Sequence, residues 1–385
     1  MKLYIGADLV PTEANLTAYR SGDLSEVIDP ALTALLQTAD YRIFNLECPL
    51  TDGGAPIDKC GPALRAPADA VNGLKALGAD FVTLANNHIL DYGEEGLADT
   101  RAVLADAGIA YAGAAEGVRH SGIYKLMADG VTLGIYCCTE HEFSVSKNGA
   151  PGAVPFEPVD SSADIAELKK ICDRVIVLYH GGREMWQYPT PELRERCHHL
   201  VKAGADLIVC QHSHCIGCAE VVDGSTIVYG QGNFHFDLPD EQSELWCTAL
   251  LLEVNITADS VSADPIPLRL RGHRLTLADD ADAAAILDGR NMRSEALADG
   301  SYLKKFDEML DENADYYLSC LSGNYFSGFL PRALNKLTGR RYKKRKLSRM
   351  YDREALLRLI NYLECETHRE VLTDILRRTL DKPER

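Results

Sequence analysis

The chain has 385 residues, of which 46% are hydrophobic, and its formal net charge is −17 at pH 7. This length and apolar content suffice for one large globular domain with a smaller addition, while the acidic balance argues against a general affinity for nucleic acid. No apolar run reaches the ~20 residues of a membrane span, and the opening MKLYIGADLV has no signal-peptide pattern, so we expect a cytoplasmic protein.

The first 115 residues alternate apolar, β-branched runs with helix-like segments. Strands are predicted at residues 3–6, 41–46, 78–85 and 109–113, and helices at 30–38, 67–77 and 96–107. Residues 48–67 contain four Pro and are predicted to form a long loop. Repeated helix and strand units of this kind predict a parallel sheet.

Later segments add antiparallel pairs to this pattern. Asp-Gly turns at 129–130 and 223–224 predict hairpins over residues 122–139 and 219–229, and residues 245–254 and 260–270 predict another strand pair. Residues 141–160 are predicted to form a loop, followed by helices at 164–171 and 191–202. Inserted hairpins favour a pair of sheets over one open sheet.

Composition changes near residue 275, where β signals stop and Ala, Leu and charged residues take over. Helices are predicted at 280–288, 301–321 and 352–378. We therefore expect one domain over residues 1–274 and a helical region over residues 275–385. The basic run 339–349, GRRYKKRKLSR, suits either an anionic polymer or membrane surface, or a solvated linker or helix face, and its short length favours the latter.

Twelve cysteines are scattered along the chain, which is unlike the disulfide framework of a small secreted domain. Cys215 and Cys218 form a single CxxC motif that is compatible with zinc or redox chemistry. Because no second pair accompanies it, buried, reduced thiols are the favoured interpretation.

Polar residues follow several predicted strands at a regular distance. Runs that begin at Asp40, Asp80 and Asp173 reach Glu47, Asn87 and His180 after seven residues, and the run from Asp206 reaches His212 and His214. Asp8 likewise follows the first strand. Because ligands collect at the carboxyl ends of parallel strands, these side chains are expected to share one site.

The resulting set of oxygen and imidazole ligands suits one or two divalent ions, Mn²⁺, Zn²⁺ or Fe²⁺. Singly, each residue has a structural alternative as a helix cap, surface carboxylate, turn residue or core histidine. Recurrence at one structural position favours the metal site, with two ions able to clamp a phosphoryl or acyl oxygen. His88, beside Asn87, is the candidate general acid.

In order along the chain, these motifs resemble the CapA family of poly-γ-glutamate capsule synthesis proteins, which are similar to calcineurin-like metallophosphoesterases. The motifs are Asp8, FNLE at 44–47, ANNH at 85–88 with DYG at 91–93, HGG at 180–182 with Glu184, HSH at 212–214, and GNF at 232–234 with FD at 236–237. They cover about residues 1–240. The resemblance implies a four-layer αββα sandwich, in the class α/β, with a helical C-terminal extension.

The resemblance also implies roles for individual residues. The metal ligands would be Asp8, Glu47, Asn87, His180, His212 and His214, and the catalytic pair would be His88 and Asp91. Arg183, Glu184, Tyr188, Asn233 and Asp237 would bind substrate. The chain departs from the metallophosphoesterase pattern at Val10, where a His is common, and at Glu47, where an Asp is common. One metal position therefore loses a ligand, which allows occupancy by a single ion, or by none in the purified protein.

The sequence supports two main functions. The first is a metal-dependent hydrolase of a phosphoester, or of a γ-glutamyl or amide bond, linked to poly-γ-glutamate or capsule polymer synthesis. The second is a non-catalytic protein that binds an anionic polymer in an assembly complex. The expected ligand is a small molecule or an anionic polymer. Redox or metal sensing through Cys215 and Cys218 is a weaker third option.

Overall fold

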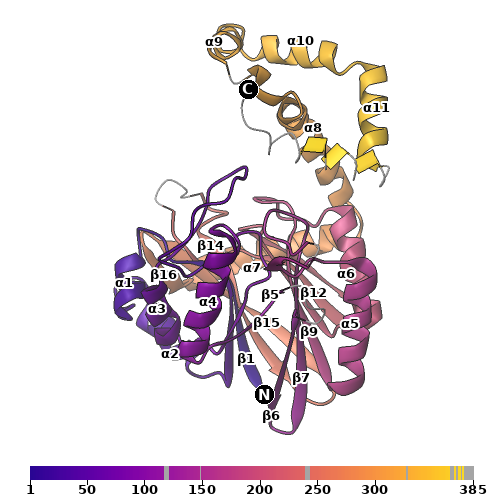
Figure 1. Cartoon of the computed structure of the whole chain (residues 1–385). Coiled ribbons are helices and arrows are strands. Elements are labelled where there is room, and N and C mark those ends of the chain that lie inside the picture. The colour runs from indigo at the N-terminus through magenta and orange to yellow at the C-terminus, as the bar shows by residue number, and fades with distance from the viewer. Residues whose placement is uncertain are drawn as a thin grey trace. The chain divides into compact units, whose positions relative to one another are not determined.

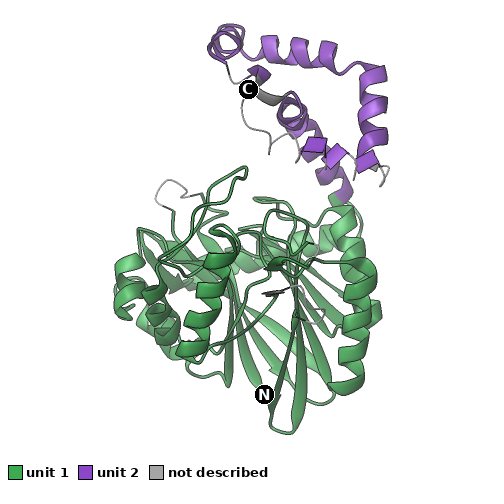
Figure 2. Ribbon diagram, in the orientation of Figure 1, with its two compact units in different colours: residues 1–302 green, residues 303–385 purple. Residues whose placement is uncertain are grey.

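The computed structural model describes residues 1–116, 121–147, 149–238, 243–326, 328–364, 368–369, 372–373 and 375–376. It divides into two compact units, residues 1–302 and 303–385, which Figure 2 colours green and purple. Figure 1 shows that the first unit is built on two β-sheets with helices outside them.

The first sheet carries the N-terminal strands at its centre. Its strand order is β16 (Arg274–Leu277), β15 (Val261–Arg271), β14 (Thr248–Ile256), β1 (Lys2–Val10), β2 (Tyr41–Leu46), β3 (Phe81–Thr83) and β4 (Ala110–Ala112), and β13 (Asn233–Phe236) also pairs with β1. Strands β1 to β4 run parallel to one another, so their carboxyl ends lie at one edge.

The second sheet has a parallel centre and antiparallel edges. Its order is β11 (Ile216–Val222), β12 (Ser225–Gln231), β10 (Leu207–Gln211), β9 (Arg174–His180), β7 (Val131–Thr139) and β6 (Ile123–Ala128). Both predicted hairpins are confirmed, β6–β7 and β11–β12. Asp129, Gly130, Asp223 and Gly224 all have positive φ, as a tight two-residue hairpin turn requires.

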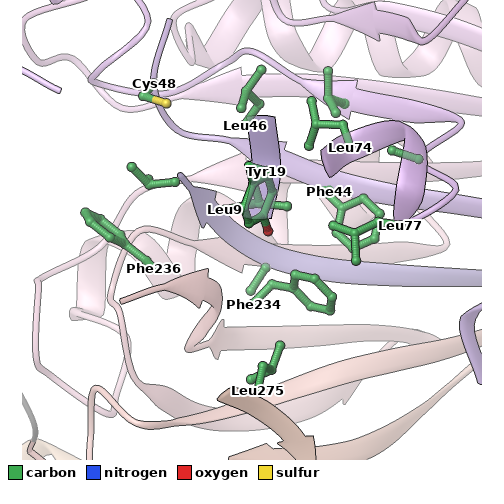
Figure 3. Packing of buried hydrophobic residues seen from close by; sticks show 14 of the residues in the cluster. Leu9, Tyr19, Phe44, Leu46, Cys48, Leu74, Leu77, Phe234, Phe236 and Leu275 are labelled. Carbon is green, nitrogen blue, oxygen red and sulfur yellow. The ribbon is translucent and has the colours of Figure 1, made fainter. Parts of the chain in front are cut away.

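Helices cover the outer face of each sheet. Five helical elements lie on the first sheet's side, α1 (Leu16–Ser21), α2 (Pro30–Leu36), η1 (Ala68–Ala70), α3 (Val71–Ala76) and α4 (Gly93–Ala107), and two on the second, α5 (Pro158–Ile171) and α6 (Pro191–Ala203). Their apolar side chains form the outer cores with the sheets, and Figure 3 shows Tyr19, Phe44 and Leu74 in the first of these.

A third core lies between the two sheets. It joins Ile5 and Phe81 of the first sheet to Leu133 and Val209 of the second, and all four side chains are buried. Helix, sheet, sheet and helix therefore form four layers, and the expected αββα sandwich is confirmed.

The aspartates that begin the repeated runs pair with the neighbouring strand. Asp40, Asp80, Asp173 and Asp206 accept hydrogen bonds through Oδ2 from the backbone N–H groups of Lys2, Arg42, Thr132 and Val175, at 2.7–2.8 Å. Each Asp N–H donates in turn to the carbonyl of that same residue. The recurring aspartates thus mark where these four strands begin. The candidate ligands lie where the same strands end, at the opposite edge of each sheet.

Some predicted segments differ in the structure. The strand predicted at residues 78–85 is only β3, because residues 84–87 leave the sheet to enter the site. The loop predicted at residues 141–160 contains β8 (Pro151–Ala153), which pairs with β5 (Ala114–Glu116) in a small separate sheet. Short helix α1 and strands β13 and β16 had no clear signal in the sequence.

The C-terminal part of the chain is helical, as expected. Helix α7 (Asp280–Ala298) packs against β11 and β15 and belongs to the first unit, which therefore extends past the composition change near residue 275. The second unit contains α8 (Tyr302–Cys320) from its second residue on, η2 (Gly323–Phe326), α9 (Phe329–Leu337), α10 (Arg341–Met350) and α11 (Arg353–Glu364). Among the described residues, no helix is both long and apolar enough to cross a bilayer.

Candidate metal centre

Polar residues at the ends of four strands meet in one buried cluster. Asp8 lies near the end of β1, Glu47 follows β2, His180 ends β9, and His212 and His214 follow β10; all five are buried. Glu47 Oε1 lies 3.3 Å from His180 Nε2 and 4.0 Å from His214 Nε2. Side chains more than 160 residues apart in the sequence therefore face a common point.

Asp8 is ionised and held from several sides. Its Oδ1 accepts a hydrogen bond from Asn45 Nδ2 at 2.7 Å, and its Oδ2 accepts one from the His212 backbone N–H at 3.1 Å. Burial alone would raise the pKa of Asp8, but the hydrogen bond from His214 and the charges of His180 and His214 outweigh it and lower the pKa to about 2.

The pKa values of the three histidines are shifted in different directions by burial and by neighbouring charges. Burial lowers the pKa of His212 well below its ordinary value, so its imidazole is neutral. For His180 and His214, burial is outweighed by the charges of Glu47 and Asp8, which raise both pKa values. The carboxylates of Asp8 and Glu47 thus favour positive charge at the centre of the cluster.

Several buried atoms of the cluster have no hydrogen-bond partner. Both carboxylate oxygens of Glu47 and the Nδ1 atom of His212 are buried and make no hydrogen bond. Leaving a buried carboxylate unpaired is costly, and a metal ion is one way to satisfy it. Three groups of donor atoms lie within 4.8 Å of one another: Glu47, His180 and His212; Asp8, Glu47 and His214; and Glu184, His212 and His214. The donor set therefore fits a divalent cation.

Asn87 joins this cluster through a hydrogen bond. Its Oδ1 lies 3.0 Å from His180 Nε2, and its backbone carbonyl accepts from Ser144 Oγ at 2.7 Å. All six residues predicted as ligands thus lie together. Five of them place carboxylate or imidazole atoms near one another, and Asn87 contacts His180.

The backbone at the last two ligands is unusual. His212 and His214 have φ of 89° and 51°, in a region that non-glycine residues seldom occupy. Such conformations cost about 1–3 kcal/mol each and persist where the surroundings enforce them. Here the turn directs the His212 N–H to Asp8 and brings His214 Nδ1 to within 3.4 Å of Asp8 Oδ2.

The two residues predicted to be catalytic, His88 and Asp91, lie in contact, and Lys59 lies beside them. His88 Nδ1 lies 2.6 Å from Asp91 Oδ2, and Lys59 Nζ pairs with Asp91 Oδ1 and lies 3.1 Å from His88 Nδ1. At 2.6 Å a proton must sit between His88 Nδ1 and the carboxylate, which leaves Nε2 as the ring atom that can serve a substrate.

The predicted substrate-binding residues divide into two groups. Asn233 Oδ1 contacts His214 Nδ1 at 2.9 Å and so orients a candidate ligand, while Glu184 lies within reach of His212 and His214. Arg183 donates to the Glu184 carbonyl. Asp237 instead contacts His273 at 2.5 Å, and Tyr188 lies near Trp186 and Tyr302.

The structure brings four further residues to the site, to which the sequence assigned no role. Asn45 contacts Asp8 and His180, Asn86 donates to Asn45 Oδ1, and Lys59 reaches Asp91 from the long loop at residues 48–67. Glu140 Oε1 lies 3.5 Å from His212 Nε2, and burial raises its pKa. Glu140 directly follows β7, so the strand-end rule would have found it, whereas nothing near Lys59 marked it.

The environment of the two CxxC cysteines does not favour reactivity. Cys215 and Cys218 are buried and free, and burial raises their pKa values to about 11 and about 12. Thiols of this kind are protonated and poorly reactive at neutral pH. The structure therefore agrees with the interpretation of buried, reduced thiols.

Solved structures are similar to this chain at low sequence identity. A hypothetical protein from Thermus thermophilus matches with a TM-score of 0.46 at 15% identity, covering 70% of this chain and 100% of its own. A phosphatase from Mycoplasma pneumoniae matches with a TM-score of 0.45 at 14% identity, covering 70% of this chain and 93% of its own.

Sequence relatives match more closely. The family model described as bacterial capsule synthesis protein PGA_cap matches residues 6–238. The PGA biosynthesis protein CapA of Bacillus subtilis is 32% identical over 53% of this chain and 55% of its own length, so the match spans little more than half of that relative. A probable polyglutamine synthesis accessory protein of Mycobacterium tuberculosis is 31% identical over 66% of this chain and 72% of its own. The matched residues of the family model include every ligand candidate and end before the helical region.

Proposed function

Because the chain belongs to the bacterial capsule synthesis protein family PGA_cap, we propose that it is a metal-dependent hydrolase of a phosphoester, or of a γ-glutamyl or amide bond. The proposed ligands are Asp8, Glu47, Asn87, His180, His212 and His214. The names of the relatives support a substrate connected with a glutamate-based or capsule polymer.

One observation carries the proposal. The Glu47 carboxylate is buried, neither of its oxygens accepts a hydrogen bond, and histidines from β9 and the end of β10 lie 3.3–4.0 Å from Oε1. A divalent cation bound there, Mn²⁺, Zn²⁺ or Fe²⁺, would supply Lewis-acid and electrostatic stabilisation of a reacting phosphoryl or acyl oxygen.

The chain's own residues supply proton transfer and alignment. His88, with Nδ1 fixed by Asp91, presents Nε2 as the group that protonates a leaving oxygen or nitrogen. Asn45 holds Asp8 and His180 in position, and Asn233 orients His214. Arg183 and Glu184, beside the cluster, together with Tyr188 and Asp237, remain the proposed substrate contacts.

The test combines metal analysis with a substrate panel. The purified full chain is loaded with Mn²⁺ or Zn²⁺, its metal content is measured, and turnover is followed on phosphoesters and γ-glutamyl peptides. Glu47→Gln keeps the shape of the side chain but removes its charge, and we expect metal affinity and turnover to fall at least about 100-fold. Glu253→Gln, which removes a carboxylate paired with Lys2, is the matched control. Unchanged metal binding and turnover in Glu47→Gln would refute the proposal.

A second candidate is a non-catalytic protein that binds an anionic polymer. Val10 favours it, because this buried apolar residue stands where metallophosphoesterases commonly carry a ligating His. In that case poly-γ-glutamate affinity should survive chelation of metal and fall steeply with salt. Metal-dependent turnover on the panel would decide against this candidate.

A further inference from the structure

The second unit exposes an unusual amount of apolar surface. Of its described residues, only Met309 and Leu347 are buried large hydrophobics, whereas 19 large hydrophobic side chains between Leu303 and Leu376 are exposed. The first unit exposes only six such side chains among its described residues. Exposed apolar side chains mark a binding face where they gather on one side of an element.

Helix α9 turns its apolar side outward. At 100° per residue, Phe329, Leu330, Leu334 and Leu337 share one face of the helix. Phe329, Leu330 and Leu337 are 85%, 70% and 82% exposed, so this face is not used in packing within the described structure.

Helix α10, which packs against α9, has a basic outer face. Its inner side is anchored by buried Leu347 and by Lys343, which donates to Ser319 Oγ at 2.9 Å. Its exposed side carries four basic residues, Arg341, Lys344, Arg345 and Arg349. We call the apolar face of α9 and the basic face of α10 the α9–α10 surface.

The charge of this segment is opposite to that of the rest of the chain. Residues 316–351 contain nine Lys and Arg and no Asp or Glu. Residues 303–385 contain 18 basic and 13 acidic residues, whereas residues 1–302 contain 22 basic and 44 acidic residues. The positive charge is therefore concentrated beside the exposed apolar face.

We propose that the α9–α10 surface binds the surface of an anionic lipid bilayer. Short amphipathic helices with bulky apolar residues on one side and Lys or Arg beside them lie in the interface, where apolar side chains enter the acyl boundary and basic ones contact headgroups. With nine residues, α9 is too short to span a bilayer, so the binding is peripheral.

Two other occupants fit the surface less well. A soluble anionic polymer would use the basic face of α10 but would leave the apolar face of α9 in water. A second copy of the chain, paired about a two-fold axis, would bring the two basic faces toward each other. An anionic lipid bilayer offers an acyl region to the apolar face of α9 and anionic headgroups to the basic face of α10.

The experiment measures sedimentation of the full chain with vesicles. Vesicles of 70% phosphatidylcholine and 30% phosphatidylglycerol are compared with pure phosphatidylcholine, at low salt and at high salt. We expect binding to the anionic vesicles only, and its loss at high salt. A triple variant of α9, Phe329→Ser, Leu330→Ser and Leu337→Ser, and a triple variant of α10, Lys344→Gln, Arg345→Gln and Arg349→Gln, should each weaken binding at least about tenfold.

Matched controls change similar groups elsewhere. Val159→Ser with Val221→Ser removes exposed apolar side chains, and Lys170→Gln with Lys304→Gln and Lys305→Gln removes three charges; both should bind as the unchanged chain does. Circular dichroism checks that helix content is kept.

Three results would overturn the proposal. Equal binding to both kinds of vesicle, or no binding to either, would show that the surface does not recognise anionic lipid. Vesicle binding that the serine variant keeps and the glutamine variant loses indicates a surface for soluble polyanions. A dimer in light scattering that only the serine variant dissociates, without vesicle binding, indicates that a second copy covers the apolar face.

Discussion

At the level of single residues, Lys59 shows how a buried charge is tolerated. Its side chain is 2% exposed and that of Asp91 is fully buried, so each charge is compensated almost only by the other and by nearby polar groups. Asp91 also accepts the Leu64 N–H at 2.6 Å and contacts His88. Removing one member of such a pair leaves an uncompensated charge, which costs more than the pair contributes.

Lys59→Met should therefore lower the free energy of unfolding by about 3–5 kcal/mol. Asn in place of Asp91 keeps an oxygen that can accept hydrogen bonds but carries no charge. We thus expect the double variant Lys59→Met with Asp91→Asn to regain most of the lost stability. Urea unfolding of the two single variants and the double variant checks this; simple addition of the two single losses would contradict the pairing.

His235 gives the chain a predictable response to acid. It is fully enclosed, with Tyr19 Oη 3.0 Å from its Nδ1, and burial lowers its pKa from 6.5 to about 4. The unfolded chain binds this proton near pH 6.5 and the folded chain only near pH 4. Stability from this group is therefore complete above pH 6.5 and is lost as the pH falls toward 4.

The expected loss is up to about 3 kcal/mol between pH 7 and pH 4. His235→Gln cannot titrate, so its unfolding free energy should fall less steeply over this range than that of the unchanged chain. Urea unfolding at several pH values gives both curves. Parallel curves would show that His235 does not contribute to the acid sensitivity.

At the level of secondary structure, the repeated aspartates act at strand starts. Each joins its carboxylate and its N–H to one residue of the neighbouring parallel strand, where a regular ladder would leave the first N–H unpaired. Three of these runs then end at a candidate ligand after seven residues, and the run from Asp206 ends at His212 and His214. One sequence repeat thus sets both the register of the sheet and the place of the site.

Asp173 offers a clean test of the strand-start role, because its Oδ2 accepts from the Thr132 N–H at 2.7 Å. Asp173→Ala should lower the free energy of unfolding by about 1 kcal/mol through the lost hydrogen bond. Asp173→Asn keeps an accepting oxygen and should lose clearly less. Guanidinium unfolding of both variants measures the difference, and equal losses would assign the effect to charge.

At the level of the whole molecule, the two units differ in how they are stabilised. The first has three buried apolar clusters, and α7 contributes to them through Ile286 and Leu297. The second has few buried apolar side chains among its described residues. The change of composition near residue 275 therefore lies before α7, the last helix of the first unit. The cellular location of the chain stays a prediction.

Truncation separates the two possible boundaries. A chain ending at residue 302 should unfold cooperatively with nearly the stability of the full chain. A chain ending at residue 274 loses the burial of Ile286 and Leu297 and should be less stable by about 3–6 kcal/mol. Calorimetry of both truncated chains checks this, and equal stability would place the domain boundary at residue 274.

The sequence alone predicted alternating helices and strands arranged in a pair of sheets, both Asp-Gly hairpins and the strand-end residues from Asp8 to His214. These features depend on local information, because neighbouring residues determine the periodicity, the turn type and the position of a residue in a strand. The resemblance to a known family added the topology and the expected roles.

Only the tertiary structure decided which distant groups face one another. Lys59 lies in a loop without any motif, yet it compensates the charge of Asp91. The unpaired state of Glu47 and the joint position of α9 and α10 likewise depend on folding. The physical reason is that burial and charge compensation are properties of surroundings assembled from remote parts of the chain, which no local pattern encodes.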